Sequence, residues 1–440
     1  MPLRLLFADD RGRVYDHPTL LAAARSGDAL LRPRGRALPL PRGGALCRLP
    51  GRRPVGIDPG TGALTVLHEV RVGRRRLVPD AVGATLPPGY TRTLLPAAGR
   101  PLLATLGAAP VLPQWAYTAA GWAEDGPAVH ALRTDRRRHW DPTTHSTPDL
   151  RRRVEGLVAT GNPIYRQLAR CALEWRCFTA QNTFYRRDEG AIPSSAACNA
   201  ACVGCLSEAD PGLPPASHER IERAPGAEEM ADLAVRHLET ASGRVMVSFG
   251  QGCEGEPLLR SKEIARAIRL IRARTRRGSI HVNTNGSLPW ALAELVAAGL
   301  DSVRISLNSA SPDLYAAYYR PRGYGLPEVI GSLGLARRRG VYLALNLLTF
   351  PGVTDRAGEV ERLCALVGRA GVDQVQTRPL AIDPDLYMSL ARERGAGGEP
   401  MGIPALVRAL RRARPGLVVG NFSRARGERR GRDPGAGREG

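Results

Sequence analysis

Three cysteines lie within eight residues of one another, at Cys198, Cys202 and Cys205. Their CxxxCxxC spacing lets three thiolates on one loop face a common centre. Soft thiolate ligands select iron–sulfur clusters or zinc. The chain has eight cysteines, and in a reducing compartment such a tight group indicates a metal site rather than disulfides.

The same motif favours one kind of metal site over the other. A structural zinc site normally takes four protein ligands, usually as two separated pairs. Here three cysteines stand close together, and no histidine lies nearby in the sequence to complete a set. A cubane held by three cysteines leaves one iron open, which is where substrate chemistry happens. The motif therefore favours an iron–sulfur cluster.

Such a loop needs elements that position it, and the sequence is regular from about residue 190 onward. Apolar, β-branched runs recur and are separated by segments of helical periodicity. The runs lie at 191–197, 244–250, 279–286, 302–309, 341–350 and 374–382. Alternating strands and helices predict an α/β fold with a parallel sheet. We expect a partial (β/α)6 barrel, with its functional residues at the C-terminal ends of the strands.

Composition and periodicity indicate three further regions outside the core of the barrel domain. Residues 1–145 are rich in Gly, Pro and Arg and predict a small β-rich N-terminal region of unknown role. Residues 146–189 show helical periodicity and predict a helical connector to the barrel domain, which spans 190–422. The Arg/Gly-rich tail, 423–440, has too little apolar surface to fold alone and is expected to be disordered.

In this setting, the cysteine motif resembles the signature of the radical S-adenosylmethionine (SAM) superfamily. The resemblance covers about 190–420, and further motifs follow in the family's order. CEGEP at 253–257 is similar to the family's GGEP motif, and TNG at 284–286 is similar to the TNG often found after the third strand. The resemblance implies SAM contacts from these motifs and from the later strand ends, namely Gly255, Glu256, Pro257, Asn285, Ser306, Asn308 and Thr349.

The resemblance also suggests what each motif holds. It implies that Gly255 and Glu256 help to bind the amino group of SAM, and that Ser306 and Asn308 contact its ribose or carboxylate. Many members carry an aromatic residue just before the third cysteine, packed against adenine. This chain has Gly204 there, which can still offer its backbone.

The resemblance implies an enzyme with two cofactors, a [4Fe–4S] cluster and SAM. One electron, from a donor such as flavodoxin or ferredoxin, would split SAM into methionine and a 5′-deoxyadenosyl radical that modifies an unidentified substrate. RNA modification is an alternative to peptide or small-molecule modification. An alternative of another class is a non-catalytic metal-binding or regulatory protein that uses the cysteines structurally. Such a protein has no need of CEGEP and TNG at successive strand ends.

Four further residues are candidates for contact with substrate. Arg378 ends the sixth expected strand, and Arg320 and Arg322 lie in the loop after the fourth, where they could bind an anionic group or simply face solvent. Cys253 adjoins the expected SAM site, although a small residue in a tight turn needs no further role. The remaining cysteines are expected to be mostly core residues.

The net charge of +21 raises the question of nucleic acid as a partner. Lys262 is the single lysine, so the excess is almost all arginine, in a chain also rich in Ala, Gly and Pro. Compositional bias spread over the surface is favoured over a dedicated nucleic-acid face. The chain contains no apolar run long enough to predict a membrane span, and its N-terminus does not resemble a secretion signal. We expect a cytoplasmic protein.

Overall fold

The computed structural model describes residues 2–99, 110–395 and 397–425. Most of the Arg/Gly-rich tail, which the sequence predicts to be disordered, lies outside the described residues. The chain forms two compact units. The first comprises 1–134, 349–361 and 378–409, and the second comprises 135–348, 362–377 and 410–440. The cysteine motif belongs to the second unit.

A seven-stranded sheet is the framework of the second unit, with its strands hydrogen-bonded in chain order. The strands are β18 (Arg187–Ile192), β19 (Ser242–Phe249), β20 (Ser279–Thr284), β21 (Ser302–Leu307), β22 (Tyr342–Thr349), β23 (Gln374–Pro379) and β24 (Val418–Gly420). The pairings from β18 through β22, and that of β23 with β24, are parallel. The expected α/β partial barrel is therefore confirmed, with one short strand added at its end.

The first strand of this sheet lies earlier in the chain than the sequence predicts. The expected run, 191–197, contains Pro193, which has no backbone N–H to donate to a neighbouring strand. β18 ends at Ile192, and the following residues form the start of the cysteine loop. The strand itself reads RDEGAI, so its polar first half hides it from a search for apolar runs.

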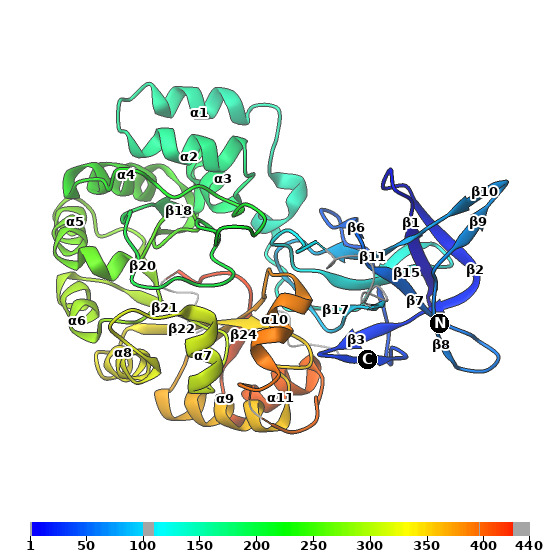
Figure 1. Cartoon of the computed structure of the whole chain (residues 1–440). Coiled ribbons are helices and arrows are strands. Elements are labelled where there is room, and N and C mark those ends of the chain that lie inside the picture. Colours follow the sequence, from blue (N-terminus) through cyan, green and yellow to red (C-terminus); the bar gives the residue numbers. More distant parts are fainter. Residues whose placement is uncertain (1, 100–109, 396, 426–440) are drawn as a thin grey trace. The chain divides into compact units, whose positions relative to one another are not determined.

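Helices cover one face of the sheet, and Figure 1 shows several of them in a row along one side of the strands. They include α4 (Ala227–Thr240), α5 (Ser261–Arg274), α6 (Pro289–Ala298), α8 (Leu326–Arg338) and α9 (Ala357–Ala370). Their apolar stripes are buried, as Ile264, Ile268 and Ile271 of α5 illustrate. Gly299 ends α6 in a left-handed conformation, with φ of 112°, which glycine adopts without steric cost. The remaining helices of the barrel region are α7 (Pro312–Tyr319), α10 (Pro384–Ala391) and α11 (Ile403–Ala413).

The two faces of the strands differ in chemistry, since successive side chains point to opposite sides of a sheet. Residues such as Val282 and Val303 make one face apolar. The other face carries polar side chains that bond across strands. Arg304 Nη1 donates to Gln376 Oε1 at 2.7 Å, and the ring of His281 lies 2.7 Å from Ser302 Oγ. The strands are thus largely buried, yet one face of the sheet is lined with hydrogen-bonding groups.

Three short helices precede this sheet, in agreement with helical periodicity in that part of the sequence. They are α1 (Leu150–Val158), α2 (Ile164–Leu173) and α3 (Phe178–Tyr185). Cys171 lies on the buried stripe of α2 with Ile164 and Leu168. Across the described residues, no helix is both long and apolar enough to span a membrane.

The first unit is β-rich, as the sequence predicts. Ten of its strands form one sheet ordered β14-β7-β2-β1-β11-β15-β16-β5, with β6 beside β11 and β8 beside β7. The strands of this unit are β1 (Arg4–Ala8), β2 (Val14–Ala22), β3 (Ala24–Ser26), β4 (Ala29–Leu31), β5 (Leu38–Pro39), β6 (Ala45–Leu49), β7 (Arg53–Ile57), β8 (Leu64–Val66), β9 (Val70–Val72), β10 (Arg75–Leu77), β11 (Asp80–Thr85), β12 (Tyr90–Arg92), β13 (Leu95–Pro96), β14 (Ala98–Gly99), β15 (Thr118–Ala123), β16 (Gly126–Val129) and β17 (Ala131–Arg133). Apolar side chains, including Leu6, Ala84 and Val129, pack together in one core cluster of this unit.

Candidate functional site

The cysteine loop follows β18 and is fixed by backbone hydrogen bonds to the end of α7. The amide of Ala201 donates to the carbonyl of Tyr319 at 3.1 Å, and the amide of Val203 donates to that of Tyr318 at 3.0 Å. Both tyrosine side chains are buried. The loop that carries the thiols is therefore held against a packed aromatic segment rather than left free in solvent.

The three thiols are half-buried and close enough to influence one another electrostatically. Burial raises the pKa of the Cys198 and Cys202 thiols, and the neighbouring thiol of Cys205 raises both further. The positive charge of Arg220 acts in the opposite direction on both. A metal ligand must be a thiolate, so a nearby cation favours the state in which these residues bind metal.

The donor set fits an iron–sulfur cluster. Cys198, Cys202 and Cys205 would hold such a cluster with one thiolate each. Three soft sulfur donors on one loop are the set that iron–sulfur clusters take.

A buried carboxylate, Glu254, ties the cysteine loop to the loop after β19. Its Oε2 accepts hydrogen bonds from the amides of Ser194 and Ser195 at 2.6 and 2.8 Å and from the Ser194 hydroxyl at 2.7 Å. Its Oε1 accepts from the amide of Gln251 at 2.5 Å. Burial raises the pKa of Glu254 to about 7, and these donors oppose the rise.

The backbone after Glu254 lies directly against the chain that leads to Cys198. The amide of Gly255 donates to the Ser195 carbonyl at 2.7 Å, and the amide of Glu256 donates to the Ala197 carbonyl at 2.8 Å. A Cβ atom at Gly255 would come within 2.0 Å of the Ala197 carbonyl oxygen. Glycine is therefore required here by close backbone approach. The CEGEP loop and the cysteine loop are thus joined by backbone hydrogen bonds.

The Glu256 side chain braces the ends of two neighbouring strands. Its Oε1 accepts from the Leu258 amide at 3.0 Å and from the Thr284 hydroxyl, and its Oε2 accepts from the Asn285 amide at 2.8 Å. Burial raises the pKa of Glu256 to about 7, against the effect of these donors. Its carboxylate is thus already bonded to protein donors. Pro257 follows it, buried, as the first residue of a short 3-10 helix, η3 (Pro257–Arg260).

Asn285 connects the hydrogen-bonded Glu256 carboxylate to the cysteine motif. Its Nδ2 donates to Asn199 Oδ1 at 2.9 Å, and its Oδ1 accepts from the Ser287 amide at 2.9 Å. Asn199 Nδ2 in turn donates to Ser287 Oγ at 3.0 Å. Because Asn199 directly follows Cys198, the loop after β20 is linked by side chains to the first cysteine.

The later strand ends are placed as follows. Ser306 Oγ accepts from Asn346 Nδ2 at 3.2 Å, on the polar face of the sheet. Asn308 is buried, and its Nδ2 lies 3.4 Å from the Leu314 carbonyl. Thr349 Oγ1 donates to the Arg378 carbonyl at 3.3 Å. Thr349 and Arg378 belong to the first compact unit, and the other expected SAM-binding residues belong to the second.

The other sequence candidates have less distinctive surroundings. Arg320 forms an exposed ion pair with Asp210 at 2.5 Å. Arg322 is exposed, and its backbone amide donates to the Asn199 carbonyl. Gly204 is half-buried between the second and third cysteines. Cys253 is buried beside Cys171 of α2, so its thiol faces the interior.

Sequence reasoning missed two residues beside the third cysteine. Arg220 Nη2 lies 3.6 Å from Cys205 Sγ, and Ser207 Oγ lies 3.7 Å from the same sulfur. Ser207 is two residues from the motif, which is a usable sequence signal. Arg220 is fifteen residues away in an irregular segment, and only the fold brings it to the thiol.

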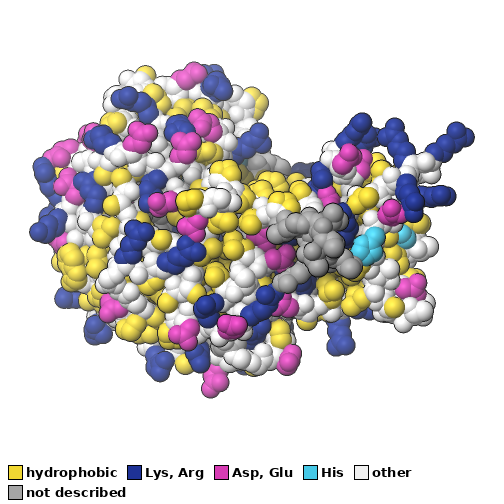
Figure 2. Space-filling model, viewed as in Figure 1, with side chains coloured by type: hydrophobic (Ala, Val, Ile, Leu, Met, Phe, Trp, Pro, Cys, Tyr) yellow, Lys and Arg dark blue, Asp and Glu magenta, His cyan; other side chains and the backbone are white. Residues whose placement is uncertain are grey.

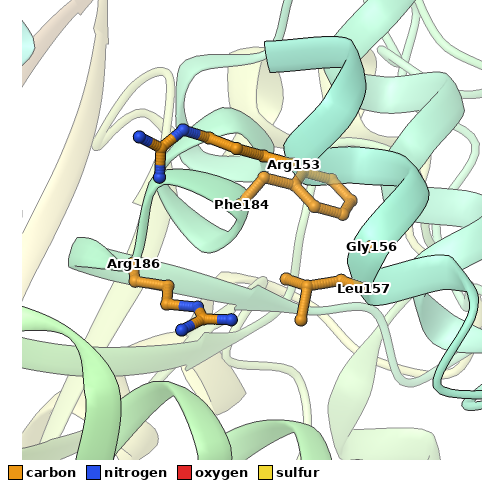
Figure 3. A pocket seen from close by; sticks show the side chains of 5 residues that line it. All are labelled: Arg153, Gly156, Leu157, Phe184 and Arg186. Atoms are coloured by element: carbon orange, nitrogen blue, oxygen red, sulfur yellow. The ribbon is translucent and has the colours of Figure 1, made fainter. Parts of the chain in front are cut away.

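A pocket of about 300 Å³ lies apart from these residues, between α1 and the end of α3. Figure 3 shows its lining, with the guanidinium groups of Arg153 and Arg186 toward the left of the view and the apolar side chains of Phe184 and Leu157 to their right. Arg153 is already paired with Asp149 at 2.6 Å. The pocket contains no thiol, carboxylate or histidine, so we do not assign the chemistry to it.

Comparisons with known proteins agree with this geometry. Residues 192–367 match the sequence model of the Radical SAM superfamily. The chain is similar to a GTP 3′,8-cyclase of Peptoclostridium acidaminophilum, with 31% identity over 171 residues that cover 38% of this chain and 48% of that protein. It is also similar to a probable dual-specificity RNA methyltransferase, RlmN 1, of Opitutus terrae, with 28% identity over 257 residues that cover 55% and 67% of the two chains.

The chain spans about half the length of the first curated relatives that it matches. Among solved structures, SuiB of Streptococcus suis bound to S-adenosylmethionine aligns with a TM-score of 0.38 and 13% identity, over 56% of this chain and 54% of that one.

Proposed function

Since residues 192–367 belong to the radical SAM superfamily, we propose that this protein is an enzyme that binds a [4Fe–4S] cluster and reductively cleaves SAM to modify a substrate. The observation that carries the proposal is the cysteine loop. That loop is hydrogen-bonded, through backbone and carboxylate contacts, to the CEGEP loop that adjoins it. A structural metal site would not require that second loop.

The residues of this chain have distinct tasks in the proposed reaction. Cys198, Cys202 and Cys205 hold the cluster, which, when bound, supplies the electron that splits the sulfonium C–S bond of SAM into methionine and a 5′-deoxyadenosyl radical. Glu254 and Glu256 hold the two adjoining loops in fixed positions. Packing of the site against buried tyrosines limits the access of water to the reacting atoms.

We assign SAM binding to the strand ends that surround the cysteine loop. Gly255 offers backbone groups at the closest approach to that loop, and Asn285 is already linked to Asn199. Ser306, Asn308 and Thr349 complete the proposed set, with the backbone of Gly204 in place of the aromatic residue that many family members carry. Because Glu256 is engaged by Thr284 and Asn285, its proposed role is to shape this site rather than to be its main ligand.

The proposal extends to partners and organisation. The substrate is a polar molecule, because the face of the sheet opposite the helices presents hydrogen-bonding groups such as Ser306 and Arg304. Arg378, Arg320 and Arg322 are candidates to contact it. We propose a flavodoxin or ferredoxin as electron donor and a cytoplasmic location.

A second candidate function, RNA modification, is favoured by one feature of the first unit. The hairpin β9–β10 exposes Arg71, Arg74, Arg75 and Arg76, and Figure 2 shows dark blue side chains gathered there. Arg71 and Arg76 are directly opposite in register. Like charges directly opposite each other destabilise a hairpin unless a bound anion offsets their repulsion. Glu69 forms an ion pair with Arg76 and supplies part of the negative charge needed.

The proposed function predicts that anaerobic reconstitution gives about four irons and four sulfides per chain. Replacing Cys198, Cys202 and Cys205 together with Ala should abolish the brown chromophore, because it removes the three thiolates that are proposed to hold the cluster. Cys364→Ala is the matched control, since Cys364 is a half-buried residue of α9, and it should leave the chromophore intact. Stoichiometric zinc without iron uptake would show a structural site instead.

A further inference from the structure

The segment between the cysteine loop and α4 brings a guanidinium to the third cysteine. Arg220 Nη2 lies 3.6 Å from Cys205 Sγ, within the range for a hydrogen bond to sulfur. Arg220 Nε donates to Ser207 Oγ at 3.2 Å, and that hydroxyl lies 3.7 Å from the same thiol. One guanidinium donor and one hydroxyl, whose single proton either the sulfur or the Glu254 carbonyl can accept, therefore lie beside one sulfur atom.

The position of Arg220 is defined by the fold. Its side chain is only 19% exposed, and Ser207 is buried, with its hydroxyl 3.3 Å from the Glu254 carbonyl. Arg220 is thus a fixed positive charge beside the Cys205 sulfur.

An acidic residue competes for this guanidinium. Glu208 Oε2 lies 2.8 Å from Arg220 Nη2, the nitrogen that also faces Cys205. The Glu208 side chain is 63% exposed, so solvent screens its charge more than it screens the charge of Arg220. Arg220 is therefore expected to act on the sulfur more strongly than Glu208 does, and the combined effect depends on both residues.

We infer that Arg220, assisted by Ser207 and opposed by Glu208, sets the reduction potential of the bound cluster, an inference that rests on the proposed function. Reduction adds one electron and makes the cluster more negative. A cation and hydrogen bonds at a ligand sulfur stabilise that reduced state more than the oxidised one, and the potential rises. Arg220 acts through Cys205, so it is a positioning residue rather than a catalytic one.

The test is a redox titration of the reconstituted full-length protein, followed by the EPR signal of the reduced cluster. Arg220→Met should shift the midpoint potential downward, and Arg220→Lys should restore part of the shift because it keeps the charge. Glu208→Gln should shift the potential upward, because it removes the opposing charge. Ser207→Ala should lower it by less than Arg220→Met. Arg223→Met is the control, since Arg223 pairs with Glu229 at 2.8 Å and is exposed, and it should leave the potential unchanged.

The opposite signs separate this inference from a structural role. If Arg220 only held the loop together, Glu208→Gln would leave the midpoint potential unchanged or lower it. Either result overturns the inference, and the Glu208→Gln measurement remains available if the Arg220→Met protein fails to assemble a cluster. An unchanged potential in a fully loaded Arg220→Met protein also overturns it. Failure of the wild-type protein to take up iron and sulfide would instead refute the proposed function, which keeps the two failures distinct.

Discussion

Glu254 and Glu256 illustrate how the site depends on single residues. Each is a buried carboxylate that accepts a hydrogen bond from at least one backbone amide of a different segment. The CEGEP motif contains both residues, and the sequence alone suggests Glu256 as a cofactor ligand. The fold adds the bonds to Thr284 and Asn285, which no residue pattern encodes. Arg220, in contrast, belongs to no recognisable sequence motif, and only the structure shows that it lies beside the Cys205 thiol.

Replacing Glu256 with Ala should weaken SAM binding and also lower stability. The change leaves the amides of Leu258 and Asn285 and the Thr284 hydroxyl buried without an acceptor, at about 1–3 kcal/mol for each group. Thermal unfolding of the apoprotein and SAM binding to the reconstituted protein measure the two effects. Glu263→Ala is a comparison, since Glu263 bonds one amide, that of Ala227, and it should cost less stability and leave SAM binding intact. If the Glu256→Ala protein kept its stability but lost SAM binding, the result would indicate that Glu256 binds SAM directly.

At the scale of elements, the alternation of apolar runs and helical segments was enough to predict the parallel sheet. The strands β19 to β23 fall where the β-branched runs predict them. The start of the sheet was misplaced, because β18 is half polar and its register is set by pairing with β19 rather than by its own residues. The close contact between the loops after β18 and β19 follows from adjacent parallel strands, whose carboxyl ends meet at one edge of the sheet.

Gly255→Ala tests that contact between the two loops. An added Cβ would lie 2.0 Å from the Ala197 carbonyl oxygen and 3.1 Å from the Cys198 amide, so the backbone on both sides must shift. We expect a loss of stability of about 1–3 kcal/mol or more, with less iron bound per chain after reconstitution. Gly252→Ala is the matched control in the same loop, since its added Cβ would find no atom closer than 3.6 Å. Equal iron contents in the two variants would contradict the proposed bond between the loops.

At the scale of the whole molecule, composition predicted a β-rich N-terminal part but not its topology. Many of its strands are only two or three residues long, too short for periodicity to reveal. The first unit also includes 349–361 and 378–409, segments more than two hundred residues away in sequence. Buried ion pairs such as Arg52 Nη2 with Asp383 Oδ2, at 2.6 Å, hold that unit together. Long-range pairs of this kind leave no local signal in a single sequence.

The arginine-rich hairpin allows a test of the RNA alternative. If the positive charge is only compositional, RNA binding should be weak, independent of sequence and lost as salt rises, because it rests on counterion release. Replacing Arg71, Arg74, Arg75 and Arg76 with Gln should then reduce binding no more than replacing Arg151, Arg152, Arg338 and Arg339, which are also exposed. Titration of total tRNA, ribosomal RNA and a random oligonucleotide at two salt concentrations measures this. Tight binding of one RNA class at physiological salt that only the hairpin variant loses would place RNA modification first.

The central claim is that this chain cleaves SAM reductively with a cluster held by Cys198, Cys202 and Cys205. Its most direct test is to incubate the anaerobically reconstituted protein with SAM and dithionite and to quantify methionine and 5′-deoxyadenosine by mass spectrometry. We predict slow formation of both products in equal amounts without any added substrate, and none from the triple Cys→Ala variant. A protein that carries a full cluster, is reduced by dithionite and leaves SAM intact at the level of the triple variant would contradict the claim.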